Sequence, residues 1–445
     1  MSWQEEVFGP LLERTMENAQ VRHLAEQYDL SKDSSLARAI VRHTNSLLDV
    51  EEKRRQVERV RPGELMLRTR RGPLVLPLRT SEDIARVVAG ERWSTVRRDI
   101  LARCEARYRQ LFREASPGAV ERFLRCLWQG RGPKSSEPSP LHGPRKQRPW
   151  GSTTFDGTPL AELDAERARR QIERDPPRPG HRPETLQRLM HFLGAQAGIP
   201  PAIQEPMLLE LVAIRARLCP RITTLSTGQM PLVAMHVEVG RALWQSTRYQ
   251  PMAPVVVTLL ANGEARTLRH RPPTEYEQFM EFYGRRMARV LTESYVQNGL
   301  LSYAELQWIF MASTGTVSRA LDHYQRRHQV VLPCPGTVLD MGRMLTHKDL
   351  TVRLHLQGLS VLEISRRTYH NPRSIDSYLK AFEAVLILHL YGLPPRLMAS
   401  VLGRGESLIQ EYLGLIHDYL KDPHTMREHL RQRGVHFPIN VSNSG

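Results

Sequence analysis

The chain has 445 residues, a formal net charge of +16 and a sequence pI near 10.1. This excess favours polyanionic partners, although a GC-rich genome whose codons favour arginine would give the same balance. The four cysteines lie far apart, the first residues do not resemble a secretion signal, and no apolar run approaches the roughly 20 residues of a membrane span. These features argue against a disulfide framework, a cysteine zinc site and a membrane protein, and they favour a cytoplasmic location.

Residues 1–129 are expected to form a mostly helical N-terminal domain with one hairpin. Its strands would be Leu65–Arg68 and Leu74–Leu78, which flank a turn that contains Gly72. Residues 130–183 are rich in Pro, Gly and Ser, which predicts a linker, with a short charged helix near residues 160–173.

Two short segments of the N-terminal domain, residues 80–85 and 94–100, have the pattern of a helix-turn-helix. The gap between them is one residue longer than in the other candidate units, so an ordinary pair of amphipathic helices is an equal alternative. A second DNA contact here would use Thr95, Arg97 and Arg98.

Residues 184–283 predict a middle domain of mixed helix and strand. A second hairpin is expected where residues 255–260 and 265–268 flank Asn262-Gly263, because Asn-Gly suits the positive φ angles of a type I′ turn. After this hairpin the pattern is almost entirely helical as far as Leu420.

A repeat without any gap marks the C-terminal half. Leu354–Leu359 reads LHLQGL, and 34 positions later Leu388–Leu393 reads LHLYGL. A fixed period predicts two copies of one structural unit, over residues 346–383 and 384–421, followed by a tail over 422–445. Each copy reads as helix, turn, short helix, turn and longer helix, the order of a helix-turn-helix.

Local signals in the copy at 346–383 agree with this order. A first helix over residues 349–357 would end at Gly358, Ser360 and Glu363 form a capping box, and Asn371-Pro372 would start the third helix. The expected core of this unit consists of Leu356, Leu359, Ile364, Ile375 and Leu379.

A more distant copy lies upstream, within residues 284–345. It keeps a capping box, Ser302 to Glu305, and places Val317 and Leu321 at the core positions of its third helix. Residues 330–332 are a candidate wing strand after that helix.

The candidate DNA-binding residues come from the first two units, since hydroxyl and basic side chains read base edges and hold phosphates. They are Thr314, Thr316, Ser318, Arg319, Arg326, Arg327, Thr346, Lys348, Arg366, Arg367, Arg373, Ser374, Ser377 and Lys380. The last unit carries Glu406 and Glu411 at the equivalent helix, which predicts packing or dimerisation. A role in protein contacts alone is the alternative for all three units.

Thr346, His347 and Lys348 precede the first helix of the unit at 346–383. They would form a phosphate clamp if Lys348 and the helix N-terminus face an anion. In the other interpretation Thr346 is a simple cap and His347 a packing residue.

At this point the chain resembles a bacterial and archaeal family, the domain of unknown function 1670. The resemblance covers residues 254–416 and rests on Asp340–Gly342, Thr346–Lys348, Glu363–Thr368, His370, Ile375 and Glu411–Leu413. It implies helix-turn-helix proteins, some of them encoded in mobile elements, and no particular activity. Cys334–Gly336 and Gly403–Gly405 depart from the family's pattern.

No catalytic motif, metal-ligand pattern or nucleotide loop stands out, so we expect no enzyme, no metal and no cofactor. Asp156, Glu162 and Asp164 fall in the linker and are interpreted as solvated charges. We therefore expect a mainly α protein with small β-hairpins (α+β) and tandem trihelical helix-turn-helix units.

Its expected function is site-specific binding of double-stranded DNA, as a nucleoid-associated transcriptional regulator or as a DNA-recognition subunit of a mobile element. Besides double-stranded DNA, its expected partner is a second copy of the chain in a homodimer, or a protein of transposition or transcription. The alternatives are an adaptor between proteins and a metal-dependent nuclease or recombinase.

Overall fold

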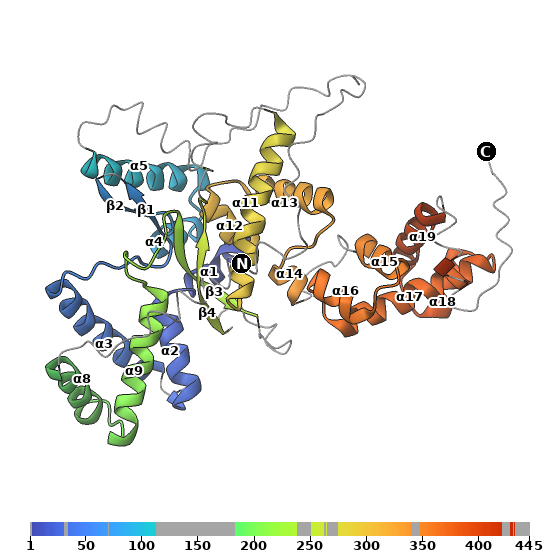
Figure 1. Ribbon diagram of the computed structural model, residues 1–445. Helices are drawn as coiled ribbons and strands as arrows, with labels where there is room; N and C mark the ends of the chain where they lie inside the picture. The colour runs from blue at the N-terminus through green and yellow to red at the C-terminus, as the bar shows by residue number, and fades with distance from the viewer. Residues whose placement is uncertain are drawn as a thin grey trace. The chain divides into compact units, whose positions relative to one another are not determined.

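The computed structural model describes residues 2–30, 34–69, 71–112, 183–237, 251–261, 264, 275–339, 348–420, 428, 429 and 431. These residues belong to two compact units, Met1–Arg327 and His328–Gly445 (Figure 1). Helices dominate both units, and the strands form one small antiparallel sheet. The expected α+β class is confirmed.

The sheet belongs to the first unit and has the strand order β2-β1-β3-β4, with β5 paired to β3. Its strands are β1 (Glu64–Thr69), β2 (Gly72–Pro77), β3 (Gln229–His236), β4 (Met252–Thr258) and β5 (Gly299–Leu300). The predicted hairpin at residues 65–78 is confirmed as the antiparallel pair β1–β2. The strand predicted over residues 255–260 corresponds to β4, which pairs with β3. The turn Asn262-Gly263 and the strand predicted over 265–268 lie outside the described residues.

Gly228 joins three strands of this sheet at one point. Its N–H donates to the carbonyl of Met66 at 2.8 Å, and its own carbonyl accepts from the N–H of Leu259 at 2.9 Å. The glycine has a φ of +83°, and a Cβ atom there would lie 1.9 Å from the carbonyl oxygen of Leu260. Only glycine permits both this backbone conformation and this close approach.

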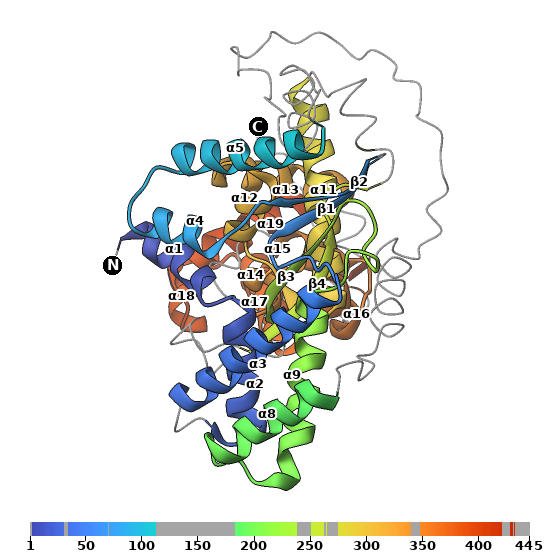
Figure 2. The same cartoon turned by 90° about the vertical axis from the view of Figure 1, so that its left-hand side faces the viewer.

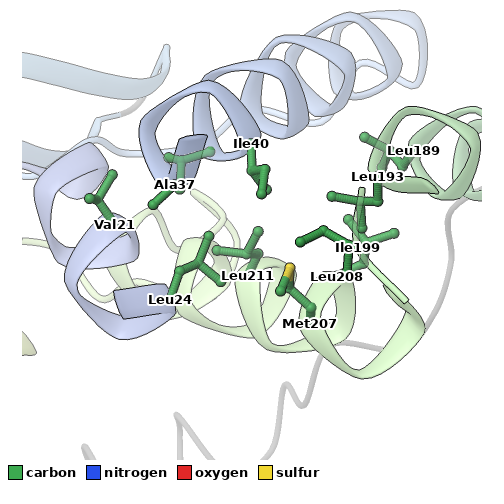
Figure 3. Close-up of a cluster of buried hydrophobic side chains, with 11 residues drawn as sticks. Val21, Leu24, Ala37, Ile40, Leu189, Leu193, Ile199, Met207, Leu208 and Leu211 are labelled. Carbon is green, nitrogen blue, oxygen red and sulfur yellow. The ribbon is translucent and has the colours of Figure 1, made fainter. Parts of the chain in front are cut away.

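Four helices pack together at one end of the first unit, as Figures 1 and 2 both show. They are α2 (Met16–Gln27), α3 (Ser34–Arg54), α8 (Pro183–Ala195) and α9 (Pro201–Leu218). Their shared core includes Leu24, Ile40, Leu193 and Leu211, all of them buried (Figure 3). The segments predicted as an N-terminal domain (1–129) and a middle domain (184–283) therefore share a core as well as a sheet, in contrast to the predicted separate domains.

The described part of this unit contains six further helices, two of which pack on the sheet. The six helices are α1 (Trp3–Leu12), α4 (Ser81–Val88), α5 (Trp93–Leu111), α11 (Tyr276–Val296), α12 (Tyr303–Phe310) and α13 (Thr314–His328). α5 packs on β2, and α11 packs on β4 and β5. Trp308 of α12 is fully buried and meets the rings of Phe8 and Trp93 edge to face. The predicted unit at 284–345 is thus divided, because its helices up to α13 belong to the first compact unit.

The second unit contains α14 (Pro335–Val338), α15 (Lys348–Leu356), α16 (Val361–Thr368), α17 (Pro372–Leu390), α18 (Pro395–Leu402) and α19 (Glu406–Leu420). Leu354, Ile364, Ile375 and Leu379 form one small core between α15, α16 and α17. Leu356, predicted for this core, lies instead in a second cluster with α17, α18 and α19. Leu354 and Leu356 lie two positions apart on the same short helix and therefore on different faces of it. The prediction assigned Leu356 to this core, whereas the structure places Leu354 there.

The structure can also be compared with the predicted wing strand, linker and tail. Residues 330–332 are not a strand, so the predicted wing is wrong; Val331 and Leu332 are buried without sheet partners. The predicted linker up to residue 182, its helix at 160–173 and most of the tail at 422–445 lie outside the described residues. Among the helices that the structure describes, none combines the length and the apolar character needed to cross a membrane.

Candidate nucleic-acid interface

Three helix pairs in the C-terminal half have the same local geometry. In each pair an eight-residue helix, namely α12, α16 or α18, is followed by a connection of three residues and then by a longer helix, α13, α17 or α19. Each connection opens with a residue in the left-handed conformation, Met311 at φ +50°, Tyr369 at φ +59° and Gly403 at φ +59°. The departure from the family pattern at Gly403–Gly405 therefore keeps the same turn.

Capping residues that are close in sequence set the ends of the helices in these pairs. Both predicted capping boxes are confirmed: Ser302 starts α12 and Ser360 starts α16. Asn371 caps α17 by accepting a hydrogen bond from the N–H of Arg373 at 2.9 Å, and Pro372 occupies the first helical position. Ser313 has the same role for α13, where its hydroxyl accepts from the N–H of Thr316 at 3.2 Å.

α17 belongs to two structural groups at once. Its first half contributes Ile375 and Leu379 to the core with α15 and α16. Its second half contributes Phe382, Val385 and Leu386 to the cluster with α18 and α19. One helix is therefore the last of one group and the first of the next, which explains why the sequence repeat continues without a gap.

The α16–α17 pair has an exposed basic surface. The predicted side chains of Arg366, Arg367, Arg373, Ser377 and Lys380 are exposed, and Ser374 is half-buried. Lys380 forms an exposed ion pair with Asp376 at 2.8 Å. Arg373, Ser377 and Lys380 have the spacing i, i+4, i+7, which places them on one face of α17. Ile375, Leu379 and Phe382 have the same spacing and form the buried face.

Lys348 does not have the exposure expected of a phosphate clamp. Its ammonium group lies 2.5 Å from Glu411 Oε2 of α19 and 5.7 Å from the centre of the Tyr378 ring. The side chain is 11% exposed, so its charge is already neutralised inside the second unit. Thr346 and His347, the other members of the predicted clamp, lie outside the described residues.

The predicted DNA-binding residues of the α12–α13 pair differ in their exposure to solvent. Arg319, Arg326 and Arg327 are exposed, whereas Thr314, Thr316 and Ser318 are half-buried. Arg327 approaches Glu281 of α11 at 3.7 Å. The two threonines have structural partners, because Thr314 donates to Gln307 Oε1 at 2.5 Å and Thr316 shares a hydrogen bond with Ser313 at 2.9 Å. Arg319 is therefore the member of this set best placed to meet a ligand.

The buried side of α12 contains an ion cluster that no local pattern indicated. Glu305, the capping-box acid, is fully buried and pairs with Arg14, whose partner atom is Glu305 Oε2. Arg79 lies 3.6 Å from the other carboxylate oxygen, and burial lowers the pKa of its guanidinium. These contacts fix α12 to segments near the start of the chain.

The α4–α5 pair resembles the other three, with a connection of four residues, 89–92, in place of three. This matches the extra residue noted in the sequence. Of the predicted contacts, Arg98 is exposed and lies 3.7 Å from Asp99, while Thr95 and Arg97 are half-buried. Asp99 also accepts a hydrogen bond from Arg86 at 2.6 Å. The acids make this surface less positive than that of α16–α17.

The α18–α19 pair has a different surface. Glu406, Ser407 and Gln410 are exposed at the start of α19, and Glu411 is the partner of Lys348. Exposed apolar side chains lie nearby, with Leu397 at 49% and Val401 at 61% on α18 and Tyr391 at 67% just before it. Leu397 and Val401 are four residues apart and share one helix face.

Comparison of the sequence with known protein families gives a match. Residues 203–415 match the family model described as "Protein of unknown function (DUF1670)", so this part of the chain is similar to that family. The predicted resemblance over residues 254–416 is confirmed, and the match begins earlier, within α9. No curated protein and no solved structure matches the chain.

Proposed function

We propose that the chain is a site-specific double-stranded DNA-binding protein. The observation that supports this function best is the α16–α17 pair, whose three-residue turn presents a basic stripe on one face of the longer helix. Helix-turn-helix proteins join two helices by a turn of three or four residues and place the second helix in the major groove. α17 would be this second helix in the chain.

The side chains on the exposed face of α17 have the chemistry for that position. Arg373 lies one turn from Ser377, near the helix N-terminus, where base edges are read. Arginine forms bidentate hydrogen bonds with guanine, and serine donates to bases or phosphates. Arg366 and Arg367 of α16 would contact the backbone and set the orientation of the helix.

The α12–α13 pair would supply a second contact through Arg319, since its turn and capping box repeat those of α16–α17. Two recognition helices in one chain would follow neighbouring stretches of the groove. The function could be transcriptional regulation or target recognition for a mobile element.

A gel shift with the full chain tests the proposal. Duplexes enriched from a random-sequence pool serve as probes, at about 50 and 200 mM salt, because phosphate contacts make affinity fall steeply with salt. We expect Arg319→Ala with Arg373→Ala to weaken binding at least tenfold and to lower the salt slope by about one for each phosphate contact removed. Arg404→Ala, which removes an equal charge from the turn before α19, should have little effect.

The proposal fails if no duplex is enriched, if affinity does not depend on salt, or if Arg404→Ala weakens binding as much as the double change. Circular dichroism of each variant separates loss of binding from loss of folding.

A protein-contact role is the second candidate, and the exposed apolar face of α18 favours it. A second copy of the chain is the partner that we propose, because helix-turn-helix proteins commonly bind as symmetric dimers. Sedimentation equilibrium should show a dimer that Leu397→Glu with Val401→Glu converts to a monomer. A wild-type monomer at all concentrations would contradict dimerisation and leave DNA binding unaffected.

A further inference from the structure

Three metal-ligating side chains meet in the second unit, apart from the basic surface of α16–α17. They are His355 of α15, Glu383 of α17 and His429 near the C-terminus, and their ligand atoms all lie within 4.8 Å of one another. His355 Nε2 is 2.8 Å from Glu383 Oε1, and His429 Nε2 is 3.8 Å from the same oxygen. Two imidazoles therefore approach one carboxylate from two different segments of the chain.

The surroundings of these side chains differ from those of an exposed ion pair. The exposed fractions are 12% for His355, 24% for Glu383 and 5% for His429. The three side chains are therefore mostly withdrawn from solvent. The two imidazole rings have centres 5.0 Å apart and an interplanar angle of 69°, so they meet edge to face and are not stacked.

The donor set has the chemistry of a zinc site. Two histidines and one glutamate are a known set of three protein ligands for Zn²⁺, in which water takes the fourth tetrahedral position. Bonds of about 2.0–2.2 Å require neighbouring ligand atoms to lie roughly 3.3 Å apart. To reach this spacing, His355 Nε2 and Glu383 Oε1, now 2.8 Å apart, must separate by about half an ångström, and His429 Nε2, now 3.8 Å from the same oxygen, must approach it by about as much.

We propose that His355, Glu383 and His429 form a binding site for Zn²⁺. The ion would join the C-terminal segment that carries His429 to α15 and to α17, the helix that belongs to both structural groups of the second unit. Because a metal site ties together residues far apart in sequence, its binding free energy adds to the stability of the unit. The proposal is independent of DNA binding.

Isothermal titration of metal-free full-length protein, without an affinity tag, measures the site directly with Zn²⁺. We expect one tight equivalent per chain, and we expect His355→Ala, His429→Ala and Glu383→Gln each to weaken it at least tenfold. Co²⁺ is a second probe, since tetrahedral Co²⁺ with nitrogen and oxygen ligands absorbs visible light strongly, and this absorption should be lost in the same variants.

His389→Ala is the matched control. His389 and His417 also form a close pair in this unit, with ring centres 5.3 Å apart, but among the residues that the structure describes no carboxylate completes a cluster with them. The control should bind Zn²⁺ as the wild type does. A wild-type chain that binds no Zn²⁺, or an equivalent that His355→Ala and His429→Ala leave intact, would overturn the proposal.

Thermal unfolding separates metal binding from a folding defect. Zn²⁺ should raise the melting temperature of the wild type and of His389→Ala by several degrees, because it binds the folded state alone. The melting temperature of His429→Ala should match the metal-free wild type and should not respond to Zn²⁺. An equal response to Zn²⁺ in His429→Ala would also contradict the site.

Discussion

Lys348 of α15 donates a hydrogen bond to Glu411 of α19, with Nζ 2.5 Å from Oε2. The contact joins α15 to α19 within the second unit, and the same ammonium group lies over the ring of Tyr378. Glu411 belongs to the helix whose acids were expected to repel phosphate, and Lys348 was a candidate to bind it. The structure instead gives each charge an internal partner.

Replacing Lys348 by Met should destabilise the second unit by about 1–3 kcal/mol, because Glu411 would lose its charged partner. Glu411→Gln in the Lys348→Met background should restore part of this loss. Urea unfolding followed by circular dichroism measures both changes. Tryptophan fluorescence is unsuitable, since residues 328–445 contain no tryptophan.

DNA affinity provides the complementary measurement for Lys348. If the ammonium group is internal, Lys348→Met should leave the salt slope of the folded protein unchanged. A slope lowered by about one would show a phosphate contact instead.

The two capping boxes differ in what surrounds their acids. Glu305 is fully buried with Arg14 and Arg79, whereas Glu363 is exposed. Glu305→Gln should cost about 3–5 kcal/mol, because it leaves buried guanidinium groups without a counter-charge. Glu363→Gln should have a much smaller effect. Tryptophan fluorescence reports the first change through Trp308, and circular dichroism reports the second.

The pH dependence of the α16 cap has a defined sign. Hydrogen bonds from the side chain and backbone of Ser360 lower the pKa of Glu363 in the folded state. This contribution to stability is therefore present above the ordinary carboxyl pKa and is lost as pH falls through the lowered value. Ser360→Ala should reduce this dependence and cost about 1 kcal/mol. An unchanged pH profile in this variant would contradict the capping role.

The sequence predicted the features that depend on neighbouring residues. Ser360 with Glu363, Gly358 and Asn371-Pro372 act within one helical turn, so their pattern alone specifies where α15 ends and where α16 and α17 begin. The same holds for the β1–β2 hairpin, whose strands adjoin one turn.

Contacts between distant segments could not be read in the same way. The pairing of β1 with β3 and the approach of Arg14 to Glu305 depend on which surfaces meet after the elements have formed. All seven residues of α12 from Ala304 to Phe310 are buried, and the capping box that predicted the start of this helix carried no information about its burial. The contacts of Lys348 with Glu411 and of His355 with Glu383 could not be predicted either, because they too join residues far apart in the sequence.

α11 and α13 cross closely at Gly284. A Cβ atom there would lie 2.5 Å from the carbonyl oxygen of Ala320 and 2.7 Å from Cβ of Tyr324. Gly284→Ala should therefore destabilise the first unit by about 1–3 kcal/mol, since backbone atoms must move apart. Gly9→Ala in α1 is the control in the same unit, because its Cβ would meet nothing closer than 4.0 Å. The control should be neutral or stabilising by up to about 1 kcal/mol, and equal losses in the two variants would rule out the close crossing as the cause.

Two cysteines of the first unit are protected by the fold. Burial raises the pKa of Cys104 to about 12 and that of Cys219 to about 11. Because the thiolate is the reactive form, both should resist iodoacetamide at about pH 8 in the native protein. The half-buried Cys334 of the second unit should react sooner.

Mass spectrometry of the labelled peptides resolves the individual cysteines. In increasing urea, Cys104 and Cys219 should become reactive together, over the range where tryptophan fluorescence reports unfolding of the first unit. This follows from their shared unit, in which Cys104 packs on the sheet side of α5 and Cys219 lies at the end of α9. Labelling of either residue in the native protein as fast as in the unfolded chain would show that burial does not protect these thiols.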